Sequence, residues 1–204
     1  MLHTRDDYKT VNSPDQRHRV PWQAVGVSLC LILLQLQTEP WLYQRSLINL
    51  GDYWRVWTGN WVHTNTWHLT LNLAGFWLLF LLNPAAFYTR GLLPLIAYLG
   101  LGVGMGLWWF NPEVQWYVGF SGVLYGLYFQ TGIQFLNQKD RLSAALILAG
   151  ICGKTLWDWQ HQGESISSAL VQAPIIYAAH GYGMVSSLLW SMIQQGVQYA
   201  QKTA

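Results

Sequence analysis

The most constraining feature of the sequence is a series of long apolar runs in a chain with few charged residues. The 204 residues are 52% hydrophobic and only 10% charged, whereas an ordinary soluble domain carries about 25% charged residues. Several runs approach the roughly 20 residues that a helix needs to cross a bilayer. The runs cover residues 22–38, 67–83, 92–110, 118–136, 142–157 and 174–195. The sequence therefore predicts an all-α, polytopic membrane protein with six transmembrane helices.

The two ends of the chain are polar and flank a single membrane domain. We expect residues 1–21 and 197–204 to be cytoplasmic tails and residues 22–196 to form the domain. The first twenty residues contain no apolar stretch, so the first membrane helix is expected to stay attached rather than to be removed with a signal peptide. The net charge of +2 is too small to suggest nucleic acid. Cysteine and histidine spacing suggests no metal site, and we expect no cofactor.

The distribution of Lys and Arg predicts how the helices are oriented. Eight of these residues fall on the side of the two termini and three fall on the other side. Because cytoplasmic loops carry an excess of positive charge, both termini are predicted to be cytoplasmic. Helices two, four and six then start at the outer face. The first group is Arg5, Lys9, Arg17, Arg19, Arg90, Lys139, Arg141 and Lys202, and the second is Arg45, Arg55 and Lys154.

Polar residues recur near the outer ends of three predicted helices. His68 and Asn72 lie in the first turns of the second helix, Ser121 in the first turn of the fourth, and His180 about two turns into the sixth. At a rise of 1.5 Å per residue, all lie within roughly 10 Å of the outer ends. Polar side chains inside a membrane are costly and usually face the bundle interior or a water-filled cavity. Their shared depth predicts a functional site.

Ser121 and His180 are the candidate nucleophile and base at this site. A serine becomes a competent nucleophile only when a base takes its proton. Small residues four apart let membrane helices approach closely, and such spacing near both residues would bring the two side chains within reach. Packing alone is the alternative explanation of the small residues. They are Gly122 and Gly126 on the fourth helix, and Ala179, Gly183 and Ser187 on the sixth.

Other polar residues would complete an acyl-transfer site. His68 and Asn72 share one helix face and, with the backbone N–H of Ser121, can donate to a developing oxyanion. Asn72 serving only to join two helices is the alternative. Tyr125, one turn after Ser121, is placed to pack against the ring of His180. No Asp or Glu falls inside a predicted helix core, which indicates a Ser–His dyad. Asp158 and Glu164, expected in the last outer loop, stay open as assisting groups.

Five motifs follow one another along the chain: YWR (53–55), the trio His63, His68 and Asn72, GFSG (119–122, with Gly119 and Gly122), Tyr125, and Ala179, His180 and Gly183. In their order and placement these motifs resemble those of the rhomboid intramembrane serine proteases, over roughly residues 40–190. The resemblance implies that Ser121 is the nucleophile, His180 the base, and His68 and Asn72 the oxyanion-hole side chains. It also implies that Tyr125 supports the base and that His63 and Arg55 are structural members of the outer loop. Ser187 departs from a glycine repeat that many family members continue.

The segment GKTLWDWQHQG (153–163) looks most like that of the rhombosortase subfamily. That resemblance implies a bacterial inner-membrane protease whose site opens to the periplasmic side. Its substrates would be exported proteins with a Gly-Gly-containing, membrane-spanning C-terminal sorting tail. The alternatives are a general rhomboid for other single-pass substrates and a non-catalytic, client-binding rhomboid. A transporter or haem-binding bundle using His63, His68 and His180 is a third, disfavoured because no intramembrane carboxylate or broken helix marks a transport path.

Overall fold

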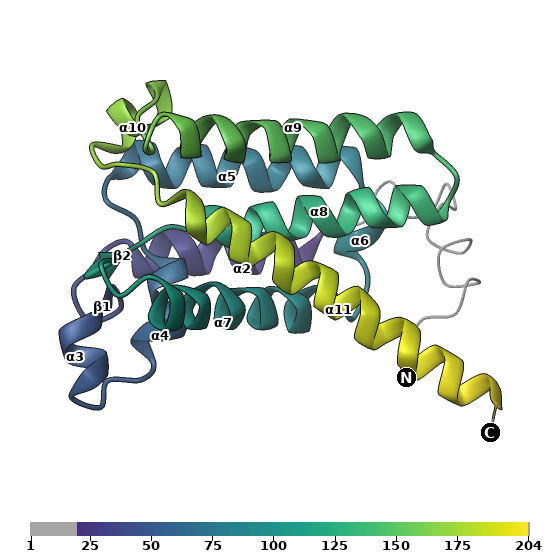
Figure 1. The fold of residues 1–204 in the computed structure, drawn as a ribbon, viewed down its shortest axis with the longest axis horizontal. Helices are drawn as coiled ribbons and strands as arrows, with labels where there is room; N and C mark the ends of the chain where they lie inside the picture. Colours follow the sequence, from purple (N-terminus) through teal and green to yellow (C-terminus); the bar gives the residue numbers. More distant parts are fainter. Residues whose placement is uncertain (1–19, 204) are drawn as a thin grey trace.

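The computed structural model describes residues 20–203, most of which lie in a bundle of six long helices. Figure 1 shows them packed side by side, with the last helix crossing the bundle obliquely. The two-residue strands β1 (Tyr43–Gln44) and β2 (Trp116–Tyr117) pair antiparallel, with Tyr43 opposite Tyr117, and are the exception to an all-α fold in the described part. The long helices are α2 (Trp22–Leu34), α5 (Thr66–Leu82), α7 (Leu92–Phe110), α8 (Ser121–Asn137), α9 (Arg141–Gln160) and α11 (Tyr177–Thr203).

Short helices occupy three of the connections between the long ones. The 39–66 loop, which we expected to face outward, holds α3 (Arg45–Asn49), α4 (Arg55–Thr58) and the 3₁₀ helix η2 (Gly59–Trp61). A fourth, α6 (Pro84–Phe87), follows α5, and α10 (Ile166–Val171) follows α9. The side chain of Asn65, which caps α5, donates to the carbonyls of Leu170 and Val171, so α10 is docked on the start of α5.

The predicted apolar runs correspond to the long helices, with shifted ends. The run 92–110 matches α7, which is the one described helix that is both long and apolar enough to meet the usual test for a membrane span. Helices α2 and α5 are apolar too, but with 13 and 17 residues they are shorter than that test requires. The first run was expected to reach residue 38, but α2 ends at Leu34, where the backbone tightens into a turn in which the N–H groups of Leu36 and Gln37 donate to the carbonyls of Leu33 and Leu34. The Gln35 side chain bonds the backbone N–H and carbonyl of His63.

Two further boundaries differ from the expectation. Helix α11 starts at Tyr177 rather than at residue 174 and continues to Thr203, so most of the expected C-terminal tail is helical. The expected N-terminal tail falls almost wholly on residues 1–19, outside the described residues, as do four of the eight cations used to predict orientation.

Small residues bring α8 and α11 into close contact. A Cβ on Gly126 would lie 2.8 Å from the carbonyl oxygen of Gly183, and a Cβ on Gly183 would overlap the carbonyl oxygen of Gly122. Ser187 is buried on the same seam and donates to the side chain of Gln130, at 3.0 Å. The predicted small-residue seam is confirmed, and it fixes the backbones that carry Ser121 and His180.

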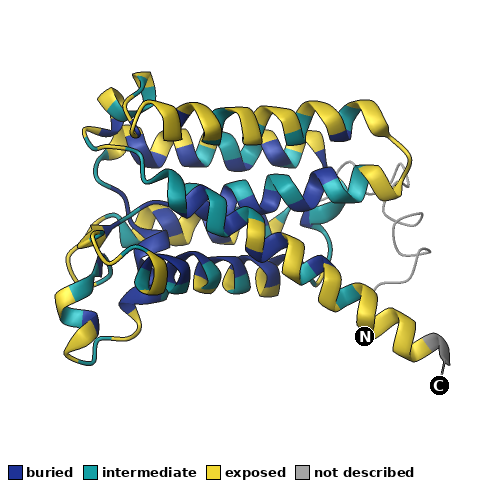
Figure 2. Cartoon of the chain, viewed as in Figure 1, coloured by how far each residue is buried: buried dark blue, intermediate teal, exposed yellow. Residues whose placement is uncertain are grey.

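Much of α9 and of the C-terminal part of α11 is exposed, as Figure 2 shows. Many of the exposed residues of the long helices are large and apolar. Helix α9 buries only Ala144 and Asp158 among its residues, while Leu142, Leu146 and Leu156 are exposed. Exposed apolar faces of this kind suit contact with lipid tails.

Candidate active site

Ser121 and His180 lie within hydrogen-bond distance of each other. Ser121 is the first residue of α8, and His180 lies in the first turn of α11 because that helix begins later than predicted. The Nε2 atom of His180 is 3.1 Å from the Oγ atom of Ser121. His180 is buried, whereas Ser121 is partly exposed. This is the geometry that a hydroxyl nucleophile and its general base need.

The ring of Tyr125 stacks on the ring of His180. The ring centroids are 3.9 Å apart and the planes differ by 3°. Tyr125 follows Ser121 by one helical turn, so the Ser121 hydroxyl and the Tyr125 ring lie on the same face of α8. The stack restricts rotation of the imidazole and keeps Nε2 toward Ser121.

A strained turn before α8 positions Ser121. Gly119 has φ +128°, a conformation that L side chains rarely adopt. Its N–H donates to the carbonyl of Gly59 at 3.1 Å, and its carbonyl accepts from the hydroxyl of Tyr117 at 2.8 Å. Burial raises the pKa of Tyr117, so its hydroxyl keeps the proton that it donates. No sequence motif singled out Tyr117, whose role depends on the pairing of β1 with β2.

His68 lies against the same turn. A Cβ on Gly119 would lie 2.7 Å from both Nε2 and Cε1 of His68, so only glycine leaves room for this ring. The other ring nitrogen, Nδ1, is 3.2 Å from the hydroxyl oxygen of Thr64. The Nε2 edge of His68 therefore faces the backbone just before Ser121.

Asn72 is buried one turn after His68. Its Nδ2 donates to the carbonyl oxygen of His68 at 3.1 Å, within the same helix. An amide has two N–H groups, so one donor is left for another acceptor. This hydrogen bond lies within α5 and does not connect α5 to a neighbouring helix.

Arg55 and His63 belong to the segment between α2 and α5. Arg55 is buried, pairs with Asp52 at 2.9 Å, and donates to the carbonyls of Glu39 and Leu42. His63 is buried edge-on to the ring of His68, with centroids 4.9 Å apart. Burial and, to a smaller extent, the nearby His68 lower the pKa of His63 to about 3, so its ring is neutral at ordinary pH.

Asp158 contradicts the expectation that no acidic side chain falls inside a helix core. Helix α9 extends to Gln160, three residues beyond the predicted end at residue 157, and the side chain of Asp158 within it is fully buried. One of its oxygens, Oδ2, is 3.9 Å from Nδ1 of His180. Glu164, by contrast, is exposed in the turn after α9.

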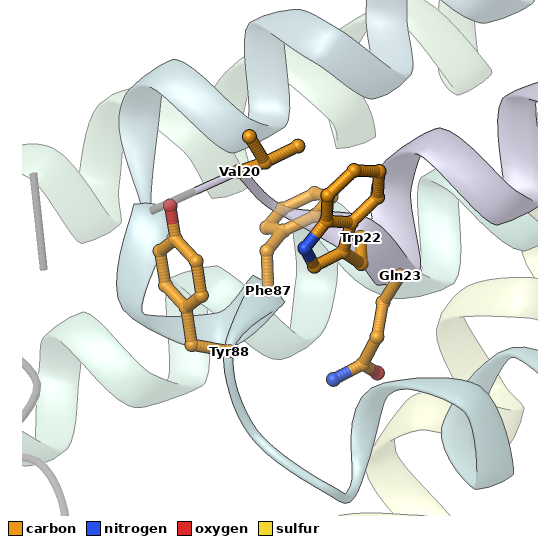
Figure 3. A pocket seen from close by; sticks show the side chains of 5 residues that line it. All are labelled: Val20, Trp22, Gln23, Phe87 and Tyr88. Atoms are coloured by element: carbon orange, nitrogen blue, oxygen red, sulfur yellow. The ribbon is translucent and has the colours of Figure 1, made fainter. Parts of the chain in front are cut away.

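The surface of the described residues includes the following two hollows. One is lined by Trp159, Gln160 and Gln162 at the end of α9 and just after it, and by Tyr177 at the start of α11. The other is at the start of α2 (Figure 3) and is lined by Val20, Trp22, Gln23, Phe87 and Tyr88. Neither hollow is lined by a candidate site residue.

The fold and the site together define a helical bundle with a Ser–His pair at the starts of two closely packed helices. A protein-family model described as Rhomboid domain matches residues 50–195, which is well over half of the 204 residues. The chain belongs to the rhomboid family and is a membrane protein. The matched region contains every candidate site residue. Among curated proteins, none matches the chain significantly.

Proposed function

We propose that this rhomboid is an intramembrane serine endopeptidase that uses Ser121 as nucleophile and His180 as general base. The observation that carries the proposal is the 3.1 Å distance between Oγ of Ser121 and Nε2 of His180. Family membership supports it, because the pair falls inside the matched region. A haem-binding or transport bundle accounts for neither the Ser–His contact nor the family.

In this mechanism the hydroxyl of Ser121 attacks the carbonyl carbon of the scissile peptide while its proton moves to Nε2 of His180. The backbone N–H of Ser121 and the side chains of His68 and Asn72 donate to the resulting oxyanion. His180 then returns the proton to the leaving amine, and the same base activates the water that hydrolyses the acyl-enzyme. Tyr125 keeps the imidazole in place through both steps.

To test the proposal, purified protein would be reconstituted in liposomes with a single-pass membrane protein as substrate. We expect a fragment cut near one end of the substrate's membrane helix, and mass spectrometry of the fragment would locate the bond. A non-catalytic, client-binding protein would retain the substrate uncut. Complete absence of cleavage across substrates that demonstrably bind would favour that alternative.

Replacing Asn72 by alanine tests the oxyanion role. Loss of one oxyanion donor costs about 2.7–4 kcal/mol of transition-state stabilisation, so the variant should be slowed by roughly a hundredfold or more and yet retain measurable activity. Thr70→Ala is the matched control on α5, because the Thr70 hydroxyl bonds only the exposed helix backbone at Thr66. Equal kcat values for the Asn72 variant and the Thr70 control would rule out the assigned role.

We further propose a rhombosortase-like substrate class: exported proteins with a Gly-Gly-containing sorting tail, cut at the periplasmic side of a bacterial inner membrane. The support is the resemblance of residues 153–163 and the position of Ser121 at a helix start. A peptide bond in a helix is shielded, so a substrate must unwind before Ser121 can attack. Glycine costs about 1 kcal/mol per helical residue relative to alanine, which makes such a tail easier to unwind. General rhomboid activity on other single-pass proteins is the alternative.

Replacing the glycines of a sorting tail by leucine should block cleavage, although the tail still inserts in the membrane. The position of the cut also tests orientation, because the eight-to-three distribution of Lys and Arg predicts that Ser121 lies near the outer face. Mass spectrometry of exported proteins from wild-type and gene-deleted cells would report the cut C-termini. Normal processing of the leucine variants would contradict the substrate class, and a cut at the cytoplasmic end of the tail would contradict the orientation.

A further inference from the structure

Asp158 is the one acidic side chain that is fully buried among residues 20–201. It lies in the last turn of α9, a helix that otherwise buries only Ala144. Its backbone carbonyl accepts from the N–H of Gly163, whose own carbonyl accepts from the N–H of Ile175, just before α11. The carboxyl group is therefore held beside the start of α11, where His180 lies.

The two carboxyl oxygens of Asp158 have different surroundings. Oδ1 accepts from Nζ of Lys154, four residues earlier on the same helix. Oδ2 is buried without a hydrogen-bond partner among the described residues, and so is Nδ1 of His180. These two partnerless atoms face each other across 3.9 Å.

A structural ion pair with Lys154 does not explain this burial. Residues four apart on a helix can pair on the exposed surface without desolvating either charge, and the Lys154 side chain is indeed 39% exposed. Burying a carboxylate with one oxygen unsatisfied is costly. The cost is explained if the unsatisfied oxygen has a partner during catalysis.

We propose that Asp158 is a positioning residue for His180, which makes the site a Ser–His–Asp triad rather than a dyad. The proposal rests on the protease function proposed above. During the reaction Nδ1–H of His180 donates to Oδ2 of Asp158 while Nε2 accepts the proton of Ser121. The carboxylate takes no proton; it fixes the tautomer of the ring and stabilises the imidazolium that forms.

The gap between the two atoms is small enough to close. A movement of about 1 Å brings 3.9 Å to hydrogen-bond distance, and catalytic hydrogen bonds often tighten only when substrate is bound. Helix α9 can make such a movement because it buries few of its side chains in the bundle. Lys154 stays paired with the other oxygen throughout.

The test compares Asp158→Asn with Glu164→Gln, an exposed acidic residue of the same outer segment. We expect Asp158→Asn to lower kcat by at least about tenfold with little change in KM, short of the roughly 10⁴-fold loss seen for a triad aspartate already in contact. The rate at which a fluorophosphonate modifies Ser121 should fall in parallel. Glu164→Gln should match the wild type in both rates. Activity of Asp158→Asn within twofold of wild type would overturn the proposal.

The double variant Lys154→Met/Asp158→Asn separates positioning from ion pairing, because it leaves neither charge unpaired. It also keeps the test decisive if Asp158→Asn alone does not fold. We expect the double variant to fold and remain slow in both assays. Recovery of wild-type rates would show that Asp158 serves only Lys154 and would contradict the triad. Failure of the wild-type protein to react at Ser121 would instead contradict the proposed function itself.

Discussion

Alanine at either Ser121 or His180 should abolish proteolysis while leaving a folded protein in the membrane. We expect a loss of more than about 10⁴-fold for each single variant and no further loss in the double variant, because nucleophile and base act as a unit. The physical reason is the single contact of 3.1 Å between their side chains, through which the proton of the nucleophile must pass. Initial rates of cleavage of a reconstituted membrane substrate would measure all three variants.

Ser46→Ala and His161→Ala are matched controls, since both residues are exposed. Both controls should cleave at the wild-type rate. Substantial cleavage by Ser121→Ala, or losses that multiply in the double variant, would contradict the assignment of the two residues to one catalytic unit.

Valine at Gly183 should remove activity and destabilise the bundle. Even a Cβ at this position overlaps the carbonyl oxygen of Gly122, one residue after Ser121. Helices α8 and α11 must then separate, which costs about 1–3 kcal/mol or more as overpacking and opens the Ser–His contact. We expect a lower midpoint of thermal unfolding in detergent and at least about a hundredfold loss of activity, because displacement of a catalytic group by about 1 Å costs that much.

Gly181→Ala is the control for this prediction, because a Cβ at Gly181 would meet nothing within 4 Å. Alanine favours a helix by about 1 kcal/mol over glycine, so this variant should be as active as the wild type and at least as stable. If Gly183→Val also retained wild-type activity and unfolding midpoint, the close approach of α8 and α11 would not be what holds the site together.

The helices and the meeting of Ser121 with His180 were predictable from local sequence signals. Apolar runs locate membrane-type helices directly, and the run 92–110 gives both ends of α7. Four-residue spacing of small residues predicts the α8–α11 seam, because that spacing sets how closely two backbones approach. Tyr125 follows from the same helical period, one turn after Ser121, and its ring stacks on His180.

The features that could not be predicted depend on chain segments that meet only in three dimensions. Tyr117, whose hydroxyl bonds the carbonyl of Gly119, lies in β2, which pairs with β1 more than 70 residues earlier in the sequence. A two-residue strand has no periodicity to detect. The sequence predicts a loop at Asp158 because hydrophobicity falls at the end of the run 142–157, whereas the helix continues to Gln160. A charge near a helix end carries no signal that it will be buried.

The most direct test of the central claim is to identify the residue of the purified, full-length protein that a fluorophosphonate modifies. Such a probe reacts covalently with a serine only when a neighbouring base activates its hydroxyl. Peptide mass spectrometry should find the adduct on Ser121 in the wild-type protein and should find none in His180→Ala. An unmodified Ser121 in the wild-type protein, or equal modification in His180→Ala, would contradict the claim that these two residues form a catalytic pair.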